Sequence, residues 1–168
     1  RDVAAPVFGL ADARLVRSGH ESSCALRANG TITCWGVNID GETGLGQASA
    51  RETIPGQVVG GLTDFVDVSV GFHHACGQRT GGAIVCWGSG AQLGDGGTTS
   101  SSVPVAVSHL READGSLTIL SPAISISCGA DFTLAALEDG AVIGWGASWE
   151  GSLGAGLAET TTNRPIRI

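Results

Sequence analysis

The sequence predicts an all-β fold made of repeated units, and three observations support this prediction. Residues 76–88 read CGQRTGGAIVCWG, residues 24–36 read CALRANGTITCWG, and a weaker copy occupies residues 134–146. A spacing of roughly 50 residues between copies is typical of propellers and solenoids. Glycine supplies 27 of the 168 residues, and charged residues make up only 15%. Such a composition indicates a turn-rich globular chain.

Each copy has the pattern of a β-hairpin, because alternating apolar positions flank a turn with glycine at a constant offset, namely Gly30, Gly82 and Gly140. A three-residue loop with glycine in the left-handed conformation places Cys24 directly opposite Cys34. Opposed strand residues have Cα atoms about 4.5–5.5 Å apart. This separation lies within the reach of a disulfide.

The same register pairs Cys76 with Cys86, whereas the third copy lacks both cysteines at these positions. We therefore expect two disulfides, each within one hairpin: Cys24–Cys34 and Cys76–Cys86. The alternative is that the cysteines are reduced and pack as small hydrophobic side chains.

Cys128 is the fifth cysteine, and it aligns with Ser18 and Val70 on the strand before each hairpin. We expect a buried free thiol at this position. An intermolecular disulfide or a reactive thiol is the alternative.

The order of the units along the chain follows from four similar proline-headed segments, which begin at Pro6, Pro55, Pro104 and Pro165. We expect a single repeat domain, residues 1–168. Within it, a closing strand of a preceding unit (1–14) comes before repeat 1 (15–59), repeat 2 (60–107) and repeat 3 (108–168). The insertion at residues 109–121 is expected to form an extra hairpin.

The second repeat carries the most complete set of motifs: residues 71–76, Gly82, residues 86–88, residues 92–94 and Pro104. Together they resemble one repeat of the regulator-of-chromosome-condensation family. In repeats 1 and 3 the corresponding Leu-Gly pairs are residues 45–46 and 153–154. The first and third repeats depart from the pattern, because Glu21 and Asp131 stand where the second has His73.

The resemblance implies that each repeat forms a four-stranded antiparallel blade of a β-propeller. The expected architecture is therefore three blades. Closed members of the family usually have seven, so the propeller is either partial or completed by association or by missing sequence.

The composition disfavours two classes of partner. The net charge is −7, with nine arginines and no lysine, and no basic cluster is present. Nucleic-acid binding needs such clusters to replace condensed counterions. No apolar stretch approaches the ~20 residues needed to cross a bilayer. We therefore expect no nucleic acid and no membrane insertion.

The five cysteines favour an oxidising compartment. The expected location is extracellular or periplasmic, at a bacterial cell surface.

Candidate catalytic and metal-binding motifs are weak. His73, His74 and Cys76 suggest zinc, but adjacent strand residues point to opposite faces of a sheet. The segments that begin at Asp40 and Asp95 have the pattern of turns. We expect no catalytic residues, no cofactor and no metal, and hence no enzyme.

The tryptophans divide into two groups. Trp35, Trp87 and Trp145 recur at one repeat position, which indicates packing between blades. Trp149 has no tryptophan counterpart, and aromatic residues on loops are frequent at interaction hot spots. A contact surface is predicted at Trp149 and Glu150, with Ile39 and Asp40 at the corresponding place in repeat 1. The alternative is local packing of these loops.

Two functions remain open at this stage. The first is a non-catalytic protein–protein interaction module of a secreted or cell-surface protein. It is similar to family members that bind a small GTPase or inhibit a secreted hydrolase through one propeller face. The second is a structural subunit of an extracellular assembly or filament, built by head-to-tail complementation of strands or blades. In that case the partners are copies of the chain itself.

Overall fold

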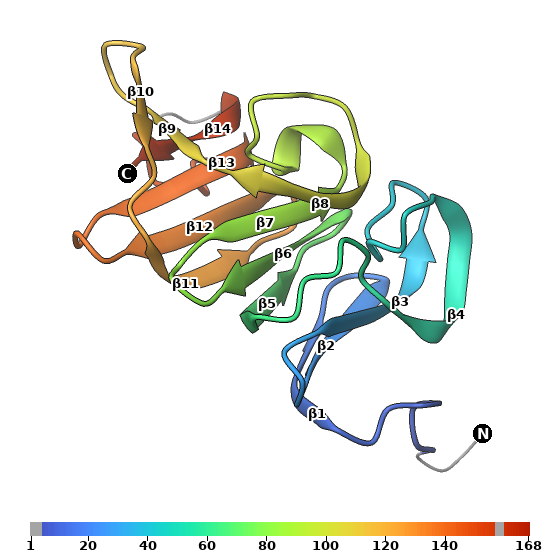
Figure 1. The fold of residues 1–168 in the computed structure, drawn as a ribbon. Coiled ribbons are helices and arrows are strands. Elements are labelled where there is room, and N and C mark those ends of the chain that lie inside the picture. Colours follow the sequence, from blue (N-terminus) through green and yellow to red (C-terminus); the bar gives the residue numbers. More distant parts are fainter. Residues whose placement is uncertain (1–4, 157–159) are drawn as a thin grey trace.

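The computed structural model describes residues 5–156 and 160–168, which form three β-sheets in chain order (Figure 1). The first sheet, blade 1, has the strand order β1-β2-β3-β4 and consists of β1 (Ala13–Ser18), β2 (Ser22–Arg27), β3 (Ile32–Asn38) and β4 (Ser49–Gln57). Blade 2 repeats this order with β5 (Phe65–Val70), β6 (His74–Arg79), β7 (Ile84–Gly88) and β8 (Ser101–Val107). The all-β, blade-like architecture predicted from the sequence is confirmed.

Blade 3 contains four equivalent strands and two additional ones. The four are β11 (Ala123–Cys128), β12 (Phe132–Leu137), β13 (Val142–Ser148) and β14 (Thr160–Arg167). The predicted hairpin at residues 109–121 forms β9 (His109–Arg111) and β10 (Leu117–Ile119). Because β9 pairs in parallel with β14, opposite Ile166, the third sheet has six strands instead of the expected four.

The hairpin register agrees with the prediction in all three blades. Cys24 lies opposite Cys34, Cys76 opposite Cys86, and Leu134 opposite Gly144. In the first turn the Arg27 amide donates to the Thr31 carbonyl at 2.8 Å. Gly30 has a φ of 77°, a conformation that glycine adopts without steric cost.

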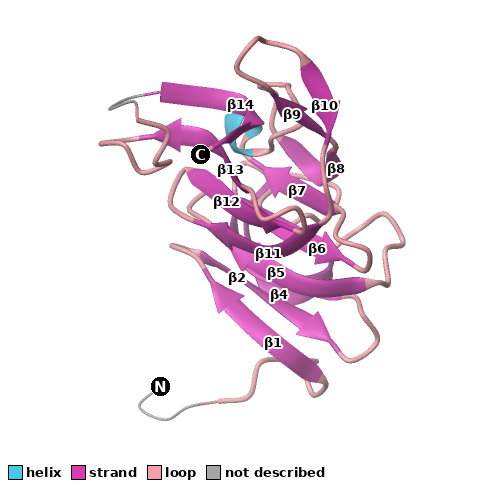
Figure 2. Ribbon diagram, turned by 90° about the vertical axis from the view of Figure 1, so that its left-hand side faces the viewer, coloured by secondary structure: helices cyan, strands magenta, loops and turns pink. Residues whose placement is uncertain are grey.

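The hydrophobic core lies between neighbouring blades. The first strands of the blades, β1, β5 and β11, succeed one another along one side of the molecule (Figure 2). Leu26 and Ile32 of blade 1 pack with Phe65 of blade 2. Ile84 of blade 2 packs in the same way with Ile126 of blade 3. Each boundary therefore buries apolar side chains from both of its blades, as expected for repeat arrays.

The segment predicted to close a preceding blade, residues 1–14, does not form such a strand in the described part of the chain. Residues 1–4 lie outside that part, residues 5–12 contain no strand, and Ala13 and Arg14 already belong to β1. A closing strand needs a third strand of its own blade as a partner, and none precedes β1 among the described residues. Val7 and Phe8 are accordingly exposed.

Over the described residues, no helix has the length and apolar character required to cross a membrane.

Candidate interaction surface

In blades 2 and 3, a tryptophan contacts the loop of the preceding blade, and we call this contact the tryptophan joint. Trp87 of blade 2 is fully buried, and its Nε1 donates to the carbonyl oxygen of Glu42 at 2.9 Å. Trp145 of blade 3 donates in the same way to Gln92, also at 2.9 Å. Trp87 and Trp145 therefore pack between blades, as predicted from their spacing. Trp35 does not, because the described residues place no blade on its side of blade 1.

The contact between the loop and the tryptophan ring shows that one detail of the repeat alignment was wrong. Gly44 lies against the Trp87 indole as Gly94 lies against Trp145. Thr43 and Gly44, rather than Leu45 and Gly46, are therefore the counterparts of residues 93–94. The amide of Thr43 bonds to the Asn38 side chain at 3.1 Å, just as the amide of Leu153 bonds to Ser148 at 3.0 Å. The sequence comparison failed here because a Leu-Gly pair follows the true contact by two residues.

Each end of the row of blades carries one of the two groups that make this contact: blade 1 has the tryptophan, and blade 3 has the loop. Trp35 of blade 1 is half-buried, and the described residues place no loop beside it that corresponds to Glu42. The loop of blade 3 repeats the Gly44 conformation at Gly154, with a φ of 73°, but no tryptophan is seated on it.

The predicted contact residues lie on loops that follow the third strand of a blade. Ile39 follows β3 with 65% of its surface exposed, and Trp149 follows β13 with 61% exposed. Glu150 adopts a φ of 53°, which is unusual for a non-glycine residue. The structure does not bring the two pairs into contact, because one pair belongs to blade 1 and the other to blade 3. Both loops nevertheless leave their blades at the same end.

A row of aromatic and charged side chains lies next to Ile39, at the boundary of blades 1 and 2. The rings of His20 and Phe72 stack with their centroids 3.8 Å apart, and Phe72 lies 5.3 Å from the His73 ring. His73 Nδ1 in turn lies 3.5 Å from an Asp40 carboxylate oxygen. We call these four residues the His20–Asp40 row.

Sequence analysis included Asp40 in a contact surface but missed His20 and Phe72. Residues 72–73 had been interpreted as part of the repeat signature, and His20 has no motif around it. The available signal was that an aromatic ring stands at this repeat position in both repeat 1 (His20) and repeat 2 (Phe72), where repeat 3 has Ala130.

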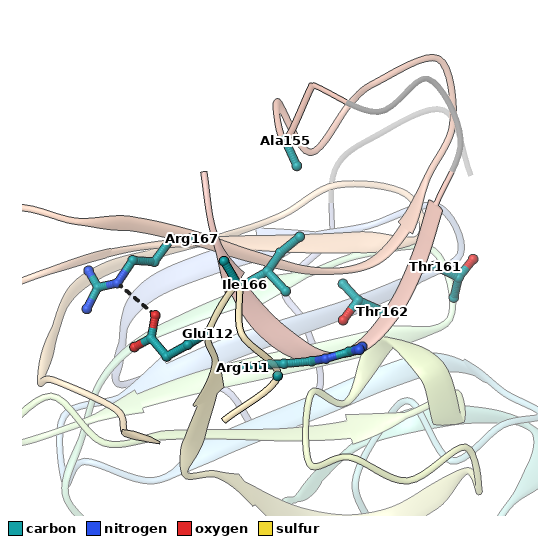
Figure 3. Close-up of a pocket in the computed structure, with 9 residues that line it drawn as sticks. Arg111, Glu112, Ala155, Thr161, Thr162, Ile166 and Arg167 are labelled. Carbon is teal, nitrogen blue, oxygen red and sulfur yellow. Dashed lines mark ion pairs between the residues drawn. The ribbon is translucent and has the colours of Figure 1, made fainter. Parts of the chain in front are cut away.

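An open depression of about 420 Å³ lies at the outer edge of blade 3 (Figure 3). Arg111 of β9 and Arg167 of β14 line it. Arg167 lies 3.6 Å from Glu112 and 3.7 Å from Asp139, so its charge is balanced by two carboxylates.

The four disulfide cysteines and His74 are fully buried, and Cys128 is partly buried. Disulfides join Cys24 to Cys34 and Cys76 to Cys86, each with a Cα separation of 4.1 Å, in the pairing that the hairpin register predicts. Cys128 is a free cysteine. Burial raises the pKa of its thiol to about 11. Burial lowers the pKa of His74 to about 4.

His74, Cys76 and Cys128 bring ring nitrogen and sulfur atoms within 4.8 Å of one another. Metal binding at this cluster is blocked as long as the sulfur of Cys76 is bonded to Cys86, since thiolates are the zinc ligands. The His73 side chain does not join this cluster, because it is partly exposed and lies beside Asp40.

Known proteins share both the repeat and the fold. A family model described as the regulator of chromosome condensation (RCC1) repeat matches residues 123–148. The probable E3 ubiquitin-protein ligase HERC4 of Rattus norvegicus is 32% identical over 154 residues, which is 88% of this chain and 14% of that protein. The chain therefore spans a small part of this relative.

Two solved structures of a yeast protein resemble the chain. Prp20p of Saccharomyces cerevisiae superposes with a TM-score of 0.81 at 20% identity, over 96% of this chain and 39% of its own. Yeast RCC1 (Prp20) in its complex with Kap60 superposes with a TM-score of 0.77 at 21% identity, over 96% and 38% of the two chains.

The fold and the tryptophan joint define the class of protein: the described residues form part of a β-propeller assembled from repeated blades. The matched residues 123–148 and the 32% identical relative show that the chain carries repeats of the regulator-of-chromosome-condensation family.

Proposed function

We propose that the chain is a non-catalytic protein–protein interaction module whose partner docks on the loops that carry Ile39, Asp40, Trp149 and Glu150. The observation that supports this most directly is the exposure of Ile39 and Trp149, at 65% and 61%, in loops that follow the same strand of their blades. Exposed large apolar residues on loops held by a rigid scaffold are typical of binding surfaces.

The charges around these residues favour a cationic partner. Asp40 and Glu150 flank the two apolar side chains, Glu21 lies 3.8 Å from His20 at the end of the His20–Asp40 row, and the whole chain carries a net charge of −7. Complementary charge steers association and selects partners more than it adds affinity. The proposed partner is therefore a protein segment that combines arginine or lysine with apolar residues.

The similar proteins support protein binding in general terms. Prp20p has binding properties toward Gsp1p and histones, and Prp20 forms a complex with Kap60. HERC4 carries the name of a ubiquitin ligase, but the region that this chain matches is 14% of that protein. We extend to this chain only the role of a binding module.

We further propose that the chain works in an oxidising environment, extracellular or periplasmic, at a bacterial cell surface. The two hairpin disulfides support this location, because disulfides persist where cytosolic reductants are absent.

Peptide selection tests the proposed surface. A random-peptide display library is selected on the wild-type chain, and the enriched peptides are then titrated against two variants. The double variant Ile39→Asp/Trp149→Ser removes the apolar contacts. The control Ile119→Asp changes a side chain on β10 that is 85% exposed and lies away from these loops.

We expect cationic, apolar peptides whose affinity falls at least about tenfold for the double variant and stays unchanged for the control. Peptides that bind all three chains equally would contradict the proposal.

Head-to-tail assembly is a second candidate, and the complementary ends of the row of blades favour it. A blade bearing a loop like that of Gly154 would seat Trp35 as Gly44 seats Trp87. That blade belongs either to a second copy or to further sequence of the same polypeptide. Light scattering on a size-exclusion column decides whether copies supply it. Larger species that grow with concentration and vanish in Trp35→Ala support assembly, and a single species at every concentration contradicts it.

A further inference from the structure

The free thiol of Cys128 in blade 3 lies beside the Cys76–Cys86 disulfide of blade 2. The sulfur atoms of Cys128 and Cys76 lie within 4.8 Å of each other and of a His74 ring nitrogen. They meet because β11, which ends at Cys128, packs against β6, which carries Cys76. Blade packing therefore places a nucleophilic group next to a bond that it can attack.

The Thr133 hydroxyl lies between these groups. It donates to the sulfur of Cys128 at 3.5 Å, lies 3.8 Å from the sulfur of Cys76, and lies 2.9 Å from His74 Nε2. A hydrogen bond donated to sulfur stabilises the thiolate more than the thiol. Since the thiolate is the form that performs disulfide exchange, this contact favours reaction.

Blade 1 provides a natural comparison within the same chain. Its Cys24–Cys34 disulfide occupies the equivalent hairpin position, but no cysteine faces it from the next blade. Val70 stands opposite Ala75 in the register in which Cys128 stands opposite Thr133, so valine replaces the thiol. The two disulfides therefore differ in the one feature that exchange requires.

We propose that Cys128 and the Cys76–Cys86 disulfide form an intramolecular exchange site, at which the disulfide moves from within blade 2 to the boundary of blades 2 and 3. The Cys128 thiolate attacks the sulfur of Cys76, the Cys76–Cys86 bond breaks, and Cys86 leaves as a thiolate. Cys86 takes up the proton that Cys128 lost, so no oxidant or reductant is consumed. The product joins β6 covalently to β11.

The environment of Cys128 sets the pH dependence of this step. Burial raises the pKa of the thiol to about 11, the hydroxyls of Thr133 and Ser69 oppose this rise, and Asp67 of β5 adds to it. His74 of β6, with a pKa of about 4, is neutral throughout the range from pH 7 to 9. The thiolate fraction, and with it the exchange rate, is expected to increase about tenfold per pH unit in this range.

The sequence allows each disulfide isomer to be identified directly. The chain has no lysine, so trypsin cuts after arginine alone, and Arg79 and Arg111 separate Cys76, Cys86 and Cys128 into peptides 52–79, 80–111 and 112–167. The full chain is incubated at pH 7, 8 and 9 and blocked with N-ethylmaleimide at successive times. It is then digested at slightly acidic pH, and linked peptide pairs are quantified by mass spectrometry.

We expect peptide 52–79 to become linked to 112–167, with Cys86 blocked in peptide 80–111, at a rate that increases about 100-fold from pH 7 to pH 9. The linked pair should be absent in Cys128→Ser. It should form more slowly in Thr133→Val, which removes the hydroxyl but keeps the shape of the side chain. The Cys24–Cys34 pair, carried by peptides 18–27 and 28–51, should stay intact.

Three results would overturn the proposal. One is a Cys76–Cys86 link that persists with Cys128 blocked at every pH. Another is a Cys86–Cys128 link, which would place the attack on the wrong sulfur. The last is scrambling of Cys24–Cys34 at the same rate, which would indicate general exchange in an unfolded chain.

Discussion

The indole nitrogen of Trp87 donates a hydrogen bond of 2.9 Å to the carbonyl oxygen of Glu42 and so joins blade 2 to blade 1. Trp145 and Gln92 repeat this contact between blades 3 and 2. Both tryptophans are fully buried. The blades are thus connected by one side chain that fills an apolar boundary and satisfies a loop carbonyl at the same time.

Replacing Trp87 should weaken this boundary measurably. Trp87→Phe removes the hydrogen bond and leaves the Glu42 carbonyl without its indole donor, so the free energy of unfolding should fall by about 2 kcal/mol. Trp35→Phe is the matched control, because Trp35 is half-buried at the outer face of blade 1, and its cost should stay below about 1 kcal/mol. Urea unfolding measures both values, and equal losses would contradict the account.

Gly44 tests the close approach of the loop to the indole. Gly44 and Gly61 have nearly equal φ values of 69° and 67°, so alanine at either site carries a similar backbone strain of about 1–2 kcal/mol. A Cβ at Gly44 would lie 2.9 Å from the Trp87 ring, whereas Gly61 has open space around it. Gly44→Ala should therefore cost about 1–3 kcal/mol more than Gly61→Ala in the same unfolding experiment. Similar costs would indicate that the loop is not packed on Trp87.

His74 should make stability depend on pH. Burial, and secondarily His73, lower its pKa from 6.5 to about 4 in the folded chain. Between these two values the unfolded chain binds more protons than the folded one. Stability is therefore complete above pH 6.5 and decreases as the pH falls toward 4, by at most about 1.4 kcal/mol per pH unit.

A series of urea titrations from pH 7 to pH 4 measures this slope. His74→Gln should remove most of this pH dependence. His109→Gln, which changes a half-buried histidine on β9, should leave the pH dependence in place. A slope that survives in His74→Gln would assign the effect to other groups.

The hairpin disulfides should contribute to stability in equal measure. Each joins residues separated by 10 positions, and a loop of this length corresponds to about 3 kcal/mol in the chain-entropy model. The double variants Cys24→Ala/Cys34→Ala and Cys76→Ala/Cys86→Ala should each lose about this amount in urea unfolding. Variants as stable as the wild type would show that the bonds do not constrain the unfolded chain.

Local features of the fold could be predicted because they follow from the turn. Once Gly30 fixes the loop of the first hairpin, the residues opposite each other are determined, and Cys24 has to face Cys34. The same reasoning placed Trp87 and Trp145 at blade boundaries from their period alone.

Features that depend on packing between segments distant in sequence could not be predicted. The addition of β9 to the edge of blade 3 rests on the pairing of Arg111 with Ile166. The approach of Cys128 to Cys76 depends on how blades 2 and 3 pack. For the candidate surface, Ile39 and Trp149 are exposed, and their role in binding stays a prediction. The stacking of His20 on Phe72 spans two blades and has no local pattern.

Hydrogen exchange of the four indole N–H groups tests the central claim, that these repeats are blades joined by tryptophans seated in neighbouring loops. Assigned NMR signals should show strong protection for Trp87 and Trp145, which are buried and hydrogen-bonded. Trp149, 61% exposed, should exchange rapidly, and half-buried Trp35 faster than the two seated tryptophans. Similar exchange rates for all four tryptophans would contradict the account.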